Sequence, residues 1–285
     1  MTTAEKLSEF ETRPGVTYAT HDSVALAGDL YLPKGAGPFP ALVGVHGGGW
    51  VQGARGQFQH WGKYLAARGV ALFAVSYRLA KPGQKTFPHA VQDVLAAIQF
   101  VRGNAKDFNI APDRVGVFGH SAGGNLGALA ALAGARFANG YPQDQHAKVS
   151  TDVKVFAGVY GVYDVAEMWG KYNIQSPKQN NIELFTGAPL PENRQLYFDA
   201  SPISYAVSAN NKVAMHLSVG TEDDLVDRRA HTDAFVLALK QAGFFVRTTI
   251  LQGAPHYWGS EPIDEPNSFS GFLAPRLLRF LQEKL

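Results

Sequence analysis

A serine lies in a sequence context that suits a nucleophile. Residues 119–123 read Gly-His-Ser-Ala-Gly, directly after the apolar run 115–118 and before the helix-like run 125–132. A serine on a sharp turn from strand to helix has a strained backbone and a hydroxyl exposed above the sheet. The flanking glycines let strand and helix approach closely, and the start of a helix favours developing negative charge. The pattern therefore predicts that Ser121 is a nucleophile.

A serine hydroxyl needs a base and an orienting acid, because it is a weak nucleophile at its free pKa. His256 is the preferred base, since it follows the last predicted strand in a loop that can reach the serine. Asp223 is the preferred acid, because it follows the penultimate strand and gives the chain order serine, acid, histidine. Asp224 and, more remotely, Asp164 are alternatives for the acid. Asp227 is predicted to cap the next helix.

The other histidines are weaker candidates for the base. His120 adjoins the serine but is directed away by the turn, and His46 belongs to another motif. His216 lies inside a predicted strand and is interpreted as a core residue. The remaining ones are interpreted as surface or helix positions: His21, His60, His89, His146 and His231.

A second motif offers hydrogen-bond donors for a substrate oxygen. Residues 46–50 read His-Gly-Gly-Gly-Trp and follow a buried-strand pattern that ends at Val45. Three glycines let bare backbone N–H groups approach a carbonyl oxygen without interference from side chains, although such triplets also form flexible turns. The N–H group of Ala122, next to the nucleophile, would complete an oxyanion hole.

The elements that must position these residues alternate between strand and helix patterns. The predicted strands cover residues 16–20, 24–32, 41–45, 70–75, 115–118, 153–159, 213–219 and 245–251. The predicted helices cover residues 91–98, 125–132, 235–242 and 273–285. This alternation predicts an α/β fold with a mostly parallel sheet of about eight strands and helices on both faces, the first two strands being an antiparallel pair. Ligands bind such sheets beyond the carboxyl ends of the strands.

Residues 164–210 interrupt the alternation. They contain aromatic residues and prolines without clear periodicity, and they form too long a stretch for a simple connection. We expect a small cap insertion over the active site, within a single domain of residues 1–285. An irregular loop packed to one side is the alternative.

Composition limits the class of protein. The chain has 285 residues, 46% of them hydrophobic and 18% charged, a formal net charge of +2 and no cysteine. These values describe a globular protein with a sizeable core and without disulfides, thiolate nucleophiles or a basic face for nucleic acid. No apolar run reaches the length of a membrane span, and the polar start of the chain lacks a signal peptide, so we expect no membrane partner and a cytoplasmic location.

Four stretches together resemble a known family. They are residues 46–50, 77–80 (Tyr-Arg-Leu-Ala), 87–94 (Phe-Pro-His-Ala-Val-Gln-Asp-Val) and 119–126 (Gly-His-Ser-Ala-Gly-Gly-Asn-Leu). With them the chain resembles α/β-hydrolases of the hormone-sensitive-lipase-like group and the related small bacterial carboxylesterases, from about residue 24 to the C-terminus, the cap matching poorly. The resemblance implies the α/β-hydrolase fold and a carboxylesterase activity.

The resemblance also implies which residues act. It assigns the triad to Ser121, Asp223 and His256, and the oxyanion donors to Gly48, Gly49 and Ala122. Two departures, residues 81–84 (Lys-Pro-Gly-Gln) and 223–225 (Asp-Asp-Leu), favour the esterase and arylformamidase relatives. Arg78 and Asp93 fit the family pattern but are interpreted as structural, pinning a loop by a charge-assisted hydrogen bond.

The expected activity is hydrolysis of short-chain carboxylic esters through an acyl-enzyme. Five aromatic residues near the expected site are candidates for the substrate-binding wall, each with a core position as the alternative: Trp50, Tyr160, Trp169, Tyr172 and Trp258. An arylformamidase acting on N-formylkynurenine is the first rival activity, and a non-catalytic small-molecule receptor is a remote one. No metal or other cofactor is expected, because ligand spacings and nucleotide-binding glycine motifs are missing. The oligomeric state, monomer or homodimer, stays open.

Overall fold

The computed structural model describes residues 7–138, 140–176, 178 and 180–285. The prediction that the chain lacks a signal peptide rests on its polar start, most of which lies outside the described residues. The strands are β1 (Phe10–His21), β2 (Val24–Pro33), β3 (Phe39–Val45), β4 (Ala71–Val75), β5 (Ile110–His120), β6 (Val155–Val159), β7 (Ala214–Gly220) and β8 (Val246–Leu251). The α-helices are α1 (Gln59–Ala66), α2 (His89–Gly103), α3 (Ala122–Phe137), α4 (Val165–Gln175), α5 (Asn181–Thr186), α6 (Arg194–Ala200), α7 (Ala234–Gln241) and α8 (Phe269–Lys284). Shorter helical turns are η1 (Arg55–Phe58), η2 (Pro202–Tyr205), η3 (Ser208–Asn210), η4 (Arg229–Asp233) and η5 (Trp258–Ser260).

The strands form one eight-stranded sheet in the order β1-β2-β4-β3-β5-β6-β7-β8. β2 pairs antiparallel with both β1 and β4, and the remaining neighbours are parallel. The predicted α/β fold with a mostly parallel sheet is therefore confirmed. Because β3 and β5 are parallel neighbours in the middle of the sheet, the loops that follow them emerge at the same edge.

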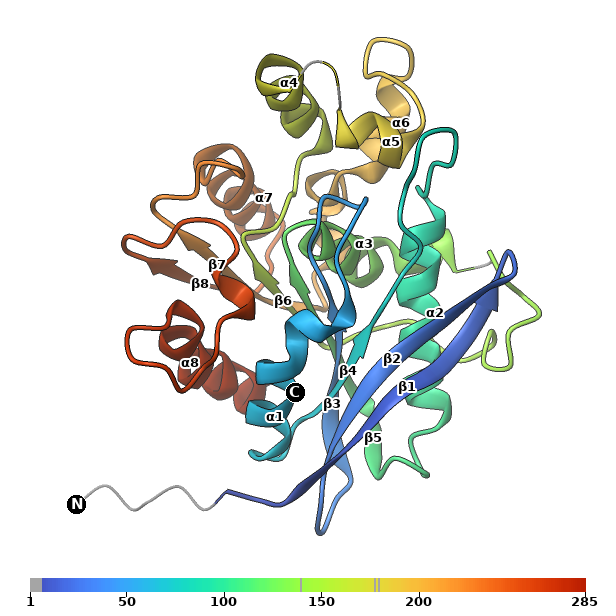
Figure 1. Cartoon of the computed structure of the whole chain (residues 1–285), viewed down its shortest axis with the longest axis vertical. Coiled ribbons are helices and arrows are strands. Elements are labelled where there is room, and N and C mark those ends of the chain that lie inside the picture. Colours follow the sequence, from blue (N-terminus) through green and yellow to red (C-terminus); the bar gives the residue numbers. More distant parts are fainter. Residues whose placement is uncertain (1–6, 139, 177, 179) are drawn as a thin grey trace.

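Helices cover both faces of the sheet (Figure 1). Leu42 of β3 packs in the cluster that contains residues of α1 and α8, whereas Val43 packs in the cluster that contains residues of α2, α3 and α7. Both side chains are fully buried. A strand that is covered on both faces has no solvent side, which explains why these strands read as continuous apolar runs.

The helix α1 was not predicted. Its eight residues contain Gly62, and a glycine inside a short segment argues against a helix. The structure shows why a glycine is there: a Cβ atom would lie 2.4 Å from the ring of Tyr31 on β2. Close packing of helix on sheet outweighs local propensity at this position.

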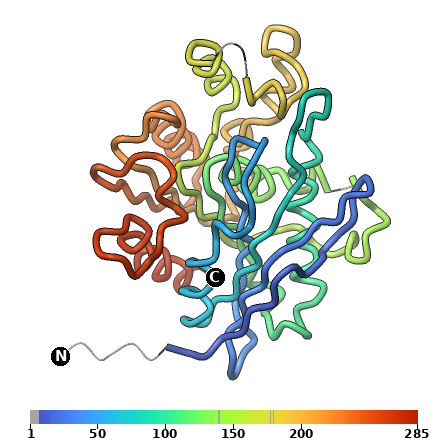
Figure 2. The backbone as a smooth tube through the Cα atoms, viewed as in Figure 1, coloured from blue at the N-terminus to red at the C-terminus, as the bar shows by residue number. Residues whose placement is uncertain are grey.

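Residues 164–210, which show no clear periodicity in the sequence, contain three short α-helices among their described residues. α4, α5 and α6 lie together beyond the sheet, at the top of Figures 1 and 2 in olive to gold. Asp164, Asn180 and Asn193 cap their N-termini by accepting hydrogen bonds from backbone N–H groups. The caps are readable in the sequence, but helices of 6 to 11 residues are too short for a clear period.

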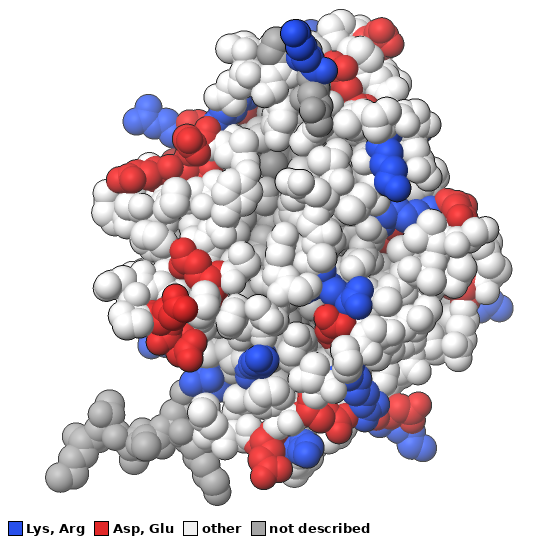
Figure 3. Space-filling model, viewed as in Figure 1, with Lys and Arg blue, Asp and Glu red and all other residues white. Residues whose placement is uncertain are grey.

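Charged side chains of both signs are interspersed over the face shown in Figure 3. Within the described part of the chain, we find no helix with the length and apolar character that crossing a membrane requires.

A buried network of charges ties the start of the sheet to α2, and it corrects the prediction for His21. This histidine is not a surface residue: it is completely buried, with Nδ1 2.7 Å from Asp93 Oδ1 and Nε2 2.7 Å from Asp144 Oδ2. Arg78 donates to both oxygens of Asp93, as its predicted structural role requires. Tyr141 stacks on the imidazole at 3.5 Å between ring centroids. Because ionised carboxylates only accept hydrogen bonds, this arrangement fits a doubly protonated imidazole.

The His21 network should make stability depend on pH. Burial lowers the pKa of His21, but hydrogen bonds to Asp93 and Asp144 outweigh it and raise the pKa above its ordinary value. The stabilisation is therefore complete below about pH 6.5, the unfolded pKa, and is lost as pH rises through the folded pKa. We expect His21→Gln to lower the free energy of unfolding by about 3 kcal/mol at pH 6, and by less at pH 9.

Urea unfolding at the two pH values measures this difference. His60→Gln, at a partly exposed histidine of α1, is the control and should change little at either pH. An equal loss of stability in His21→Gln at pH 6 and pH 9 would show that the network does not titrate in this range.

Candidate active site

Ser121 occupies the sharp turn between β5 and α3. Its φ and ψ are 52° and −118°, an unfavourable conformation for a residue with a side chain. Its N–H donates to Val159 O at 2.9 Å. Both flanking glycines are required. A Cβ atom added at Gly119 would lie 2.2 Å from Gly123 O, and a Cβ atom added at Gly123 would lie 2.0 Å from Val45 O. The packing of this turn thus explains the glycine spacing.

The histidine and the acid meet the serine at the same edge of the sheet. His256 Nε2 lies 3.0 Å from Ser121 Oγ, and His256 Nδ1 lies 2.7 Å from Asp223 Oδ2. The side chains of His256 and Asp223 are 1% and 0% exposed. In this shielded chain of hydrogen bonds, a proton on Nδ1 leaves Nε2 free to accept the serine proton.

The neighbouring carboxylates have other places. Asp223 Oδ1 accepts hydrogen bonds from the backbone N–H groups of Leu225 and Val226, at 3.1 and 2.8 Å, which fixes its carboxylate. Asp224 is exposed, and its carbonyl accepts from Lys171 Nζ. Asp227 Oδ1 accepts from Ala230 N at 2.8 Å, the predicted capping role. Of these acidic residues, Asp223 is therefore the one whose carboxylate contacts His256.

The glycine motif forms a tight loop beside the serine. Gly48 and Gly49 have φ values of 127° and 58°. At Gly48 a Cβ atom would lie 2.0 Å from Gln52 O, so the loop closes only with glycine. Gly48, Gly49 and Ala122 line one cavity together with Ser121. The backbone positions assigned to the oxyanion are thus gathered around the hydroxyl.

Two cavities open at Ser121. The first, which we call the helix-side cavity because α4 and α5 contribute to its wall, measures about 100 Å³. It is lined by Gly48, Gly49, Trp50, Gln52, Ser121, Ala122, Val162, Met168, Tyr172, Asn181, Leu225 and Tyr257. The loop-side cavity measures about 220 Å³ and is lined by Gly47, Gly48, Gln52, Gly53, Gln57, Ser121, Tyr160, Tyr257 and Ser260. Both are smaller than the roughly 300–1,000 Å³ of typical pockets for drug-sized ligands.

Three of the five candidate aromatic residues line these cavities: Trp50 and Tyr172 the helix-side cavity, and Tyr160 the loop-side cavity. Trp169 instead joins α4 to its neighbours, because its Nε1 donates to Glu183 Oε1 at 2.8 Å. Trp258 is 1% exposed and packs edge-on against Tyr160 in the core. Neither Trp169 nor Trp258 is among the described residues that line the two cavities. Trp258 is therefore a core residue, the alternative given for it, and Trp169 has a packing role.

Some lining residues were missed from the sequence. Met168, Asn181 and Leu225 reach the helix-side cavity from α4, α5 and the loop after β7. Tyr257 lines both cavities. Only Tyr257 had a readable signal, its position next to the candidate base.

Two histidines near the serine are core residues. Burial lowers the pKa of His46 to about 4 and that of His120 to about 3. His46 stacks on Tyr77 and His120 on Phe58, with ring centroids 4.3 Å apart in each pair. Both imidazoles are therefore neutral near pH 7 and directed into the protein, as predicted for His120.

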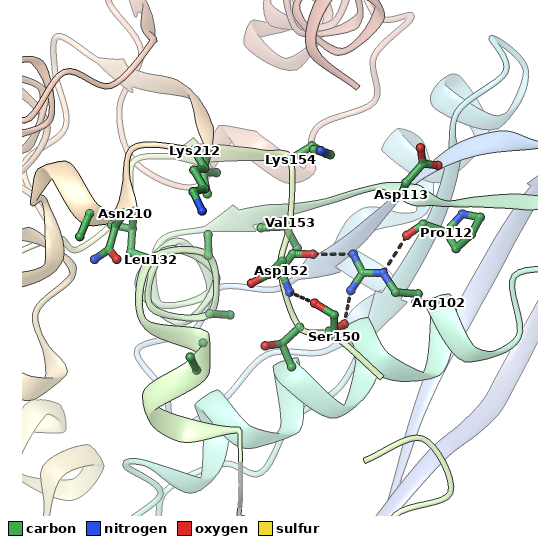
Figure 4. A pocket seen from close by; sticks show the side chains of 17 residues that line it. Arg102, Pro112, Asp113, Leu132, Ser150, Asp152, Val153, Lys154, Asn210 and Lys212 are labelled. Atoms are coloured by element: carbon green, nitrogen blue, oxygen red, sulfur yellow. Dashed lines mark hydrogen bonds between the residues drawn. The ribbon is translucent and has the colours of Figure 1, made fainter. Parts of the chain in front are cut away.

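A larger hollow of about 480 Å³ lies at the opposite end of the sheet (Figure 4). It is lined by the start of β5, the last turns of α3 and the segments that precede β6 and β7. Arg102 lines it but donates its guanidinium hydrogen bonds to the backbone carbonyls of Pro112, Ser150 and Asp152. This hollow is remote from Ser121, which stands at the carboxyl end of β5.

The sheet order and the serine turn define the class: the chain has the α/β-hydrolase fold. Est2, a thermophilic esterase from Thermogutta terrifontis, has a similar structure, with a TM-score of 0.75 and 24% identity over 97% of this chain and 92% of that chain. The family model described as BD-FAE matches residues 28–236, and the chain belongs to this family.

Curated relatives agree with the resemblance to carboxylesterases. The probable carboxylic ester hydrolase LipM of Mycobacterium tuberculosis is 29% identical over 250 residues, which cover 85% of this chain and 54% of LipM. The esterase LipQ of the same organism is 34% identical over 208 residues, 72% of this chain and 46% of LipQ. The chain thus spans about half the length of these two relatives.

Proposed function

We propose that the protein is a serine esterase that hydrolyses short-chain carboxylic esters through an acyl-enzyme. The observation that carries this proposal is the imidazole of His256, which hydrogen-bonds both Ser121 Oγ and the Asp223 carboxylate. The names of the relatives support an ester substrate.

In the proposed first half-reaction, His256 Nε2 takes the proton of Ser121 as Oγ forms a bond to the ester carbonyl carbon. Negative charge develops on the carbonyl oxygen, which accepts hydrogen bonds from the N–H groups of Gly48, Gly49 and Ala122. Asp223 stabilises the imidazolium. The C–O bond to the alcohol then breaks, and His256 gives its proton to the departing oxygen.

In the second half-reaction, water takes the place of the alcohol. His256 removes a proton from water as the water oxygen attacks the acyl carbon, and the same N–H groups hold the oxyanion. Collapse of the intermediate releases the carboxylic acid and returns the proton to Ser121. This cycle uses only groups of the chain itself.

The proposed substrates are small. Residues 164–210 act as a cap within a single domain, since Met168, Tyr172 and Asn181 from this segment wall the helix-side cavity of about 100 Å³. A cavity of this size suits short acyl groups, and we expect activity to fall well before acyl chains of about eight carbons.

A substrate panel tests the proposal. We expect hydrolysis of aryl acetate and butanoate with a kcat/KM at least a hundredfold above that for N-formylkynurenine. The comparison separates ester from formamide cleavage, which the same triad could perform. Turnover of N-formylkynurenine above that of both esters would assign the protein as an arylformamidase, and turnover of none of the substrates would favour a receptor.

A further inference from the structure

Tyr257 has a position that stability does not explain. It directly follows His256, its φ is 71°, and the residue is 68% exposed. A left-handed backbone costs a non-glycine residue about 1–2 kcal/mol, and a largely exposed ring recovers little by burial. Backbone strain that packing does not offset is typical of functional residues.

Strained aromatic residues gather around the serine. Across the described residues, those with a positive φ that are neither glycine nor a small polar residue are Trp50, Tyr160 and Tyr257. All three line a cavity that opens at Ser121. Tyr257 differs from the other two because it lines both cavities, and its ring meets the His256 ring edge-on at 4.6 Å between centroids.

The position of His256 assigns the two cavities to the two halves of an ester. A departing alcohol takes its proton from His256 Nε2, so it must lie on the histidine's side. Tyr160, whose ring centroid is 4.3 Å from that of His256, lines the loop-side cavity, as does Ser260 from the loop that carries the histidine. The helix-side cavity, with the apolar side chains of Val162, Met168 and Leu225, is left for the acyl group.

We propose that the ring of Tyr257 is the wall between these cavities and limits the length of the acyl chain that the enzyme accepts. This inference rests on the proposed esterase function. With the ring present, the acyl group is confined to about 100 Å³. The two cavities also share Gly48, Gln52 and Ser121 in their linings, so they are adjacent. We therefore expect removal of the ring to join the helix-side cavity to the loop-side cavity of about 220 Å³ and to make room for longer chains.

The test compares kcat/KM for aryl butanoate and aryl octanoate. In the wild type we expect the octanoate value to be at least tenfold lower. In Tyr257→Gly, which suits the positive φ, we expect this ratio to shrink at least tenfold while aryl acetate is still hydrolysed. Tyr257→Asn, which also tolerates this backbone, is the second variant and should behave alike.

Two control variants distinguish removal of the Tyr257 ring from other effects of a substitution. Tyr257→Phe keeps the ring and should keep the wild-type ratio. Phe198→Ala removes a comparably exposed aromatic ring from α6, outside both cavities, and should change neither activity nor ratio. A wild type without discrimination, or an unchanged ratio in both folded ring-deletion variants, would overturn the inference. In those cases ester hydrolysis itself would still stand, whereas a wild type inactive on every ester would refute the proposed function.

Discussion

Ser121→Ala is expected to lower the turnover of a short-chain aryl ester by about a millionfold. The substitution removes the atom that forms the acyl-enzyme and leaves only the oxyanion donors to stabilise attack by water. Alanine has no more bulk than serine, so the strained turn can keep its shape. Steady-state kinetics with a sensitive chromogenic ester, together with a thermal unfolding curve, measure both effects.

Ser208→Ala, at an exposed serine of η3, is the matched control and should behave like the wild type. If Ser121→Ala kept wild-type turnover, the covalent mechanism would be wrong. A loss of activity accompanied by unfolding would be uninformative, so the comparison is made well below the midpoint of the variant's unfolding transition.

Asp223→Asn is expected to lower kcat by about 10⁴-fold. The asparagine Oδ1 can still accept from the N–H groups of Leu225 and Val226, so the loop should survive. Its NH₂ group would then face His256 Nδ1, which must become an acceptor. The ring proton moves to Nε2, and His256 can no longer take the proton of Ser121.

Asp224→Asn is the matched control for the neighbouring acid. Asp224 is exposed and bonds Lys171 through its backbone carbonyl, which the substitution leaves in place. We expect kcat to change by less than about threefold, since the change removes only an exposed charge. Equal losses in the two variants would mean that charge in this loop matters more than the geometry of one carboxylate.

The sequence predicts most of the sheet because its strands are buried on both faces. β3, the second half of β5 and β6 are apolar runs for that reason, and α2 carries apolar residues at helical spacing. The missed elements owe their form to tertiary contacts. Gly62 fits α1 against Tyr31, and the helices between residues 164 and 210 are too short to show a period.

The candidate site, like the fold, has features that the sequence predicts and features that depend on tertiary contacts. Local backbone requirements are visible in the sequence: the glycines around Ser121 and the loop at Gly48 leave no room for a Cβ atom. Cavity walls are built by residues from distant elements, so single-residue chemistry could not separate Tyr172, which lines the cavity, from Trp258, which belongs to the core. His21 was misjudged because its partners Asp93 and Asp144 lie far along the chain.

Covalent labelling tests the central claim most directly. The folded wild-type protein is treated with a fluorophosphonate, and the adduct is located by mass spectrometry of its peptides. We expect one adduct per chain, on Ser121, formed much more slowly in Asp223→Asn and missing from Ser121→Ala. A folded wild-type protein that stays unlabelled, or that carries its adduct on another residue, would contradict the assignment of Ser121 as the nucleophile.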